Sequence, residues 1–186
     1  MAQKTKEAFD WDAIYRQLQQ EKKADLIQLV QELTAVSPTV AQFLHARYLH
    51  TQDITARIQP YQKRIDAQFE GEETWPDLGQ IAQAIQEYQL AARQEPEGTT
   101  ELYVYALEAA AGFFWGMGIH DIDLVGDVAE LAWQCVSHFN NFPNLYPLYA
   151  DRLHAIAAKL DEHQWEGLTD PFYQLDADMD NSEELL

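Results

Sequence analysis

Three aspartates alternate near the end of the chain, at Asp176, Asp178 and Asp180 in "YQLDADMDNSEELL". Alternating oxygen ligands open the loop of an EF-hand calcium site, which also needs a glycine at its sixth position and a bidentate glutamate at its twelfth. Counted from Asp176, the sixth position is Asn181, and the twelfth lies past the last residue of the chain. We therefore expect residues 164–186 to be a solvated acidic tail and not a calcium loop.

The last five residues, "SEELL", allow a second interpretation of this segment. Leu185 and Leu186 follow two glutamates there, as in a short amphipathic docking motif.

A His-Asp pair, His120-Asp121, is similar to part of the metal site of HD-type phosphohydrolases. Such a site also needs a second histidine and another aspartate from converging helices, for which His45 or His50 and Asp151 are the candidates. However, Asp121 stands where a helix is expected to start, and capping explains an aspartate at that place.

Carboxylate-bridged dimetal sites in helical bundles use glutamates from two helices and Glu-x-x-His pairs from two more. The chain holds one comparable pair, Asp151 and His154, and two glutamates spaced by seven, Glu101 and Glu108. A metal-dependent enzyme or metal-binding bundle is thus an alternative function, using Glu101, Glu108, His120, Asp121, Asp151 and His154.

Glu108 stands among alanines and aromatic residues, so it is expected to be partly buried. A buried carboxylate needs a partner. No base is near in sequence, and we expect a distant arginine such as Arg47, Arg57 or Arg93 to supply a structural interaction.

No sequence motif identifies a chemical reaction that this protein could catalyse. There is no Gly-x-Ser-x-Gly and no phosphate-binding glycine loop. The single cysteine, Cys135, lies on the apolar face of a helical pattern, which indicates a small buried hydrophobe and not a thiolate nucleophile. We expect no cofactor, and a protein that binds and does not catalyse.

The net charge of −19 is unevenly distributed. Residues 1–64 carry nine Lys and Arg against seven Asp and Glu, whereas residues 65–186 carry three against twenty-four. The acidic part would repel nucleic acid and anionic membranes, so the expected partner is a protein, and the charge favours a basic one. The residues expected to contact it are Glu101, Asp123, Asp127, Glu130, Leu185 and Leu186. Self-association of the two parts and mimicry of DNA by the carboxylates remain alternatives.

Helical spacing dominates the chain, and no segment alternates like a strand. About eight helices are expected. They include one starting at Ser37-Pro38, one running into Pro60 with a kink or a break there, and a central helix over 101–115 that is apolar nearly all round. "EPEGTT" before the central helix is expected to be a loop, with Thr99 or Thr100 as the cap.

The expected architecture is all-α, either an irregular α-solenoid-like array or a helical bundle. We expect an N-terminal extension at 1–8, a single helical domain at 9–163 with a sub-boundary at 70–77, and the acidic tail at 164–186. The N-terminus has no apolar secretory segment, and no stretch has the features of a membrane span. With one cysteine, the chain fits the reducing cytoplasm.

The stretch "KKADLIQLVQELTAVSPTVAQFLHARY", followed by "IQPYQKRIDAQF", resembles the uncharacterised helical region that accompanies SWIM zinc-finger domains in bacterial proteins. The resemblance covers about residues 22–69 and implies a helical, repeat-like scaffold. The zinc finger itself needs several cysteines, which this chain lacks, so no zinc ligand or functional residue is carried over.

Overall fold

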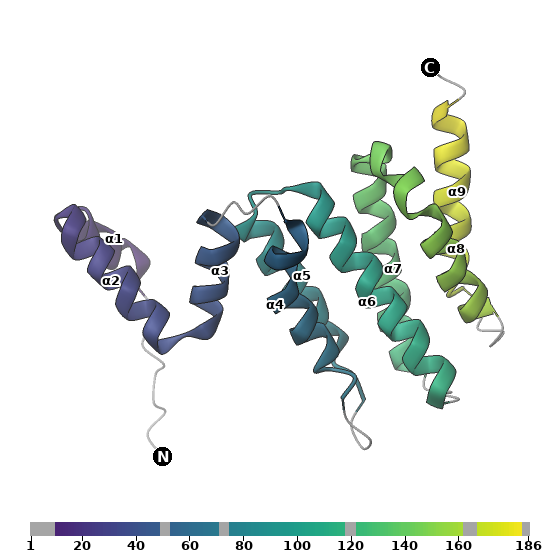
Figure 1. Cartoon of the computed structure of the whole chain (residues 1–186), viewed down its shortest axis with the longest axis horizontal. Helices are drawn as coiled ribbons and strands as arrows, with labels where there is room; N and C mark the ends of the chain where they lie inside the picture. The colour runs from purple at the N-terminus through teal and green to yellow at the C-terminus, as the bar shows by residue number, and fades with distance from the viewer. Residues whose placement is uncertain (1–9, 49–52, 71–74, 118–121, 162–166, 184–186) are drawn as a thin grey trace, which may run out of the picture. The chain divides into compact units, whose positions relative to one another are not determined.

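The computed structural model describes residues 10–48, 53–70, 75–117, 122–161 and 167–183 (Figure 1). The side chains of 115–117, 122–123 and 180–183 are not described. Over the described ranges the chain forms nine α-helices, one short 3-10 helix and no strand, so the all-α prediction is confirmed. The expected extension at 1–8 lies outside these ranges. The chain divides into two compact units, Met1–Gln42 and Phe43–Leu186.

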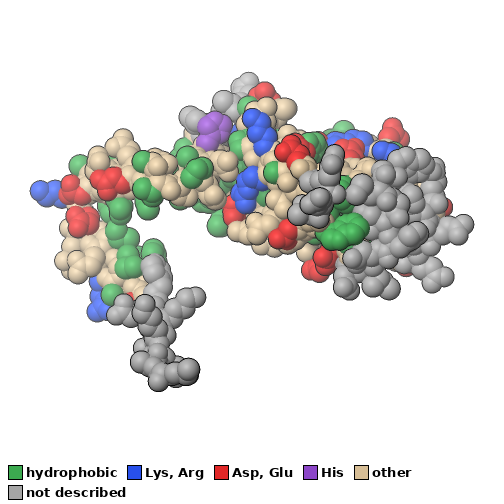
Figure 2. All heavy atoms as spheres, turned by 90° about the horizontal axis from the view of Figure 1, so that it is seen from below, with side chains coloured by type: hydrophobic (Ala, Val, Ile, Leu, Met, Phe, Trp, Pro, Cys, Tyr) green, Lys and Arg blue, Asp and Glu red, His purple; other side chains and the backbone are tan. Residues whose placement is uncertain are grey.

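The first unit holds α1 (Trp11–Leu18) and α2 (Lys23–Val36), neither of which contains a buried residue. Asp10 caps α1 as expected, because its carboxylate accepts a hydrogen bond of 3.0 Å from the Ala13 amide. Large apolar side chains are exposed to solvent on these two helices (Figure 2). The exposed residues are Trp11, Ile14, Tyr15, Ile27, Leu29, Val30, Leu33 and Val36.

Two proline predictions are tested by α3 (Pro38–Tyr48) and α4 (Ile54–Asp66). α3 begins at Pro38, and the Ser37 hydroxyl accepts from the Val40 amide at 3.4 Å. α4 continues through Pro60 as one helix and is not split into two. Its buried face carries Ile58, Tyr61 and Ile65.

The second unit continues with helices that pack in two rows (Figure 1). The elements are α5 (Leu78–Ala91), α6 (Pro96–Met117), α7 (Ile122–Asn141), the 3-10 helix η1 (Pro143–Leu145), α8 (Tyr146–Asp161) and α9 (Asp170–Glu183). One row is α4, α6 and α8, and the other is α5, α7 and α9. Contacts across the rows join α4 to α5, α5 to α6, α6 to α7 and α8 to α9. The chain does not divide at 70–77, since α4 and α5 on either side of that segment pack together in this unit.

The start of α6 differs from the prediction. "EPEGTT" is not a loop, because the helix begins at Pro96 and includes both threonines. Their hydroxyls donate back to the carbonyls of Glu95 and Pro96, at 2.9 and 2.8 Å. Glu95 provides the cap, since its carboxylate accepts from the Gly98 amide at 3.1 Å. Proline at the first helical position needs no amide partner, which accounts for the earlier start.

The predicted acidic tail is wrong over α9. Leu168, Phe172, Leu175 and Met179 recur at helical spacing and are buried, and α9 packs on α7 and α8. This spacing is readable in the sequence, but the surrounding aspartates obscured it. Burying one large apolar side chain stabilises a fold by roughly 1.5–3 kcal/mol, so each of these four side chains favours the docked helix over a solvated tail.

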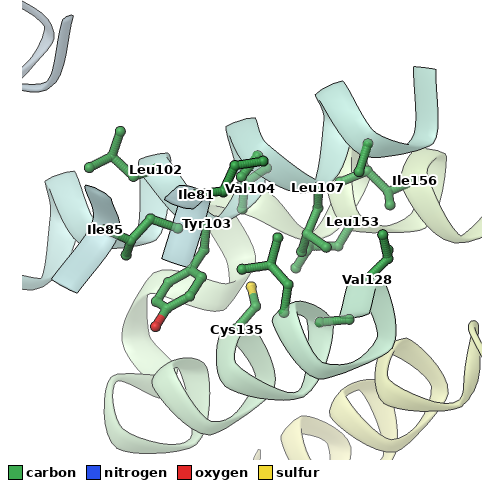
Figure 3. Packing of buried hydrophobic residues seen from close by; sticks show 14 of the residues in the cluster. Ile81, Ile85, Leu102, Tyr103, Val104, Leu107, Val128, Cys135, Leu153 and Ile156 are labelled. Atoms are coloured by element: carbon green, nitrogen blue, oxygen red, sulfur yellow. The ribbon is translucent and has the colours of Figure 1, made fainter. Parts of the chain in front are cut away.

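The core of the second unit is one cluster of buried apolar side chains from α3 to α9. Figure 3 shows its middle, where Cys135 and Val128 of α7 lie with Val104 and Leu107 of α6. Cys135 is buried, as expected, and burial raises the pKa of its thiol far above the ordinary value. Within the described ranges, no helix is both long and apolar enough to cross a membrane.

Candidate partner-binding groove

Several carboxylates of the second unit are engaged by the protein's own bases. Arg152 of α8 donates to both Glu101 and Glu108 of α6, with nitrogen–oxygen distances of 2.7 to 3.1 Å. Its guanidinium also lies over the ring of Tyr149, 5.6 Å from the centroid. Hydrogen bonds to Glu108 and Glu101 raise the pKa of the Arg152 guanidinium. Glu101, expected to face a partner, is therefore used within the fold.

The predicted partner of Glu108 was wrong, since neither Arg47 nor Arg57 nor Arg93 forms the ion pair with it. Arg47 instead donates to the backbone carbonyls of Ala91 and Leu90, and Arg57 pairs with Glu95 at 3.8 Å. The correct partner, Arg152, stands inside the "DRLH" segment that was considered for its aspartate and histidine.

The tail aspartates join α9 to its neighbours. Asp176 accepts from the Tyr146 hydroxyl, and His154 Nε2 lies 3.1 Å from both of its carboxylate oxygens. Asp178 accepts from Asn140 of α7 at 3.2 Å. The alternating aspartates thus lie on a helix, in contacts that differ from those of a calcium loop, and the side chain of Asp180 is not described.

The structure does not bring together the other residues considered for a metal site, as far as it describes them. Asp151 is exposed on α8, while His120 and Asp121 lie outside the described residues. In the part of the chain that the structure describes, no three His, Cys, Asp or Glu side chains lie close enough to hold a metal ion. Leu185 and Leu186 also lie outside that part, as does the side chain of Asp123.

Asp127 and Glu130, two of the expected partner contacts, line a hollow of about 320 Å³ between α5 and α7. A third carboxylate, Asp77, lies there too and was not anticipated. Asp77 caps α5, accepting from the Gln80 amide at 3.0 Å, and this role places it at the end of the hollow. The remaining lining residues are Leu78, Gly79, Ala82, Leu131 and Gln134.

No base neutralises this acidic hollow within the described ranges. The salt bridges between described residues use the carboxylates of Glu87, Glu95, Glu101, Glu108 and Asp176. None engages Asp77, Asp127 or Glu130. From Gln94 to Asp151 the sequence holds no lysine or arginine. The hollow therefore keeps a negative potential that a cation from outside can satisfy.

A second hollow, of about 440 Å³, is lined by side chains of α5, α6 and α7 and of the residues that follow α5 and α7. Gln134 lines both hollows, and together they form what we call the α5/α7 groove. The second hollow has no charged residue, and its lining is Gln89, Gln94, Tyr103, Gln134, Ser137, His138, Asn141 and Phe142. Gln94 reaches it from a left-handed backbone conformation, with φ of 65°, which is uncommon for a residue other than glycine.

His138 lines the second hollow and is buried, with 9% of its surface exposed. Its Nε2 lies 2.9 Å from the Thr100 hydroxyl oxygen and 3.3 Å from the Pro96 carbonyl. Burial lowers the pKa of this imidazole, so the ring is neutral at pH 7. The rings of Tyr103 and Phe142 lie 5.6 and 5.0 Å from it, centroid to centroid.

Comparison with known proteins adds no relative to this description. No protein-family model matches the chain, and neither a curated protein nor a solved structure shows significant similarity to it. The resemblance of residues 22–69 to the SWIM-associated helical region accordingly stays a prediction.

Proposed function

We propose that this chain is a non-enzymatic interaction domain that binds a basic segment of a protein partner in the α5/α7 groove. The observation that carries the proposal is the contrast between two sets of carboxylates. One set is paired with arginines inside the fold, whereas Asp77, Asp127 and Glu130 line a hollow without a base among the described residues.

The architecture supports the same proposal. In the second unit, α5 and α7 pack side by side in one row of helices, and grooves between stacked helices are surfaces that helical-array proteins use to bind other macromolecules. The open apolar side chains of α1 and α2 add surface that contacts with another protein would cover.

The test is affinity capture with matched variants. Tagged wild-type protein, Asp127→Asn/Glu130→Gln and the control Asp151→Asn/Asp161→Asn would be incubated with nuclease-treated host lysate at low and high salt. Both double variants remove two exposed negative charges, but only the first alters the groove.

We expect one discrete protein on the wild type and on the control, released by salt because exposed charges are screened. The groove variant should retain little of it. Equal retention by the groove variant would refute the groove as the site, and absence of any specific protein at low salt would refute the interaction function.

A further inference from the structure

The two ends of the α5/α7 groove differ in chemistry and are separated by a definite distance. On α7, Glu130 lies in the acidic hollow and His138 in the neutral one. Eight residues of α-helix span about 12 Å. An extended peptide covers that length in about four residues at roughly 3.3 Å each.

The hydrogen bonds around His138 determine which ring nitrogen carries the proton. The Thr100 hydroxyl donates its proton to the Pro96 carbonyl at 2.8 Å, so its oxygen is left as an acceptor toward His138. The Pro96 carbonyl can only accept. Both neighbours of Nε2 are therefore acceptors, and in the neutral ring Nε2 is the protonated nitrogen.

Nδ1 is consequently the acceptor of this ring. Both hydrogen bonds that His138 makes with described residues use Nε2. Nδ1 itself is not fully enclosed by the protein. It therefore offers a lone pair to whatever occupies the hollow that His138 lines.

The groups around this acceptor are neutral and can each donate or accept. They are the carboxamides of Gln89, Gln94, Gln134 and Asn141 and the hydroxyl of Ser137. A ligand group that fits must donate to Nδ1, accept from an amide and carry no charge, because a buried charge without a counter-ion is costly. The carboxamide of asparagine or glutamine meets all three requirements.

We propose that the α5/α7 groove binds an extended peptide segment that carries a lysine or arginine and, three to five residues away, an asparagine or glutamine. The cation lies among Asp77, Asp127 and Glu130, and the carboxamide donates to Nδ1 of His138. This inference rests on the proposed function and specifies the partner of the same groove.

Fluorescence anisotropy with full-length protein and labelled nonapeptides tests the spacing. Each peptide carries one arginine in a Gly/Ser background, with one asparagine placed two to seven residues from it on either side. We expect the tightest binding at a separation of three to five. Replacing that asparagine with leucine should weaken binding about three- to tenfold, the equivalent of one hydrogen bond.

Two measurements assign the effect to His138. His138→Phe keeps an aromatic ring without the acceptor, so it should lose the preference for asparagine over leucine and keep the dependence on arginine. In wild-type protein labelled with ¹⁵N-histidine, the asparagine peptide should shift the Nδ1 resonance of His138, and the leucine peptide should not. The second measurement does not depend on the folding of a variant.

The outcomes separate this inference from the proposed function. Arginine-dependent binding with no preference for asparagine at any spacing overturns the inference and leaves the proposed function standing. Binding of no peptide by the wild type overturns the groove as a site for extended peptides, while the lysate capture still decides whether a folded basic surface binds there.

Discussion

Gly98 of α6 lies directly against the ring of Tyr88 of α5. A Cβ atom at position 98 would stand 2.1 Å from the Tyr88 hydroxyl oxygen and less than 3 Å from two of its ring carbons. The same hydroxyl donates to Glu95 at 3.0 Å, and the Tyr88 ring packs edge-on against Tyr61, 5.3 Å between centroids. The Tyr88 side chain, near the end of α5, is therefore tightly packed against both the first turn of α6 and helix α4.

Gly98→Ala should destabilise the fold by about 1–3 kcal/mol, the range for overpacking a core. The measurement is urea unfolding followed by circular dichroism. Gly112→Ala is the matched control in the same helix, because a Cβ there meets nothing within 4 Å. It should stabilise by about 0.5–1 kcal/mol through helix propensity. Equal effects of the two substitutions would contradict the close approach at Tyr88.

Arg152→Met should destabilise the protein by about 1–2 kcal/mol, since Glu101 and Glu108 would then repel each other. The value lies below that for a fully buried pair because the Arg152 side chain is 34% exposed and water screens the charges. Adding Glu101→Gln and Glu108→Gln to this variant should recover most of the loss. No recovery in the triple variant would show that the packing of Arg152 on Tyr149 matters more than its charge.

Phe172→Ala should cost about 3 kcal/mol or more of unfolding free energy, as expected for a large side chain removed from a core. Phe172 is 3% exposed, whereas its neighbour Tyr173 on α9 is 57% exposed. Tyr173→Ala should therefore change stability by less than about 0.5 kcal/mol. If both substitutions were neutral, residues 170–183 would be a solvated tail after all.

Acid should destabilise the protein partly through His138. Burial lowers its folded-state pKa below the ordinary 6.5, so the unfolded chain takes up the proton first as pH falls. Its stabilising contribution is complete above pH 6.5 and is lost as pH falls from 6.5 through the folded-state value. No charged residue lines the hollow beside it, and Tyr103 is the other titratable side chain there.

The check compares wild type with His138→Gln, which has no proton to gain, by urea unfolding between pH 7.5 and 5. As pH falls below 6.5, the unfolding free energy of the wild type should decrease relative to that of His138→Gln. A constant difference over this range would mean that His138 titrates alike in the folded and unfolded chain.

The sequence by itself determined the all-α class and most helix positions, because helical hydrogen bonds are local and the apolar stripe repeats every three to four residues. Ser37-Pro38 and the apolar run of α6 were readable for this reason. α9 was equally readable from Leu168, Phe172 and Leu175, but its aspartates were interpreted as a tail.

Only the tertiary structure decided which carboxylates are paired and which are open. Arg152 reaches Glu108 across 44 positions of sequence, and Asp77 joins Asp127 and Glu130 because α5 packs beside α7. Such neighbours depend on how helices pack, and periodicity within one helix carries no information about its partner. For the same reason, His138 could be recognised as an acceptor only after Thr100 and Pro96 of α6 were found beside it.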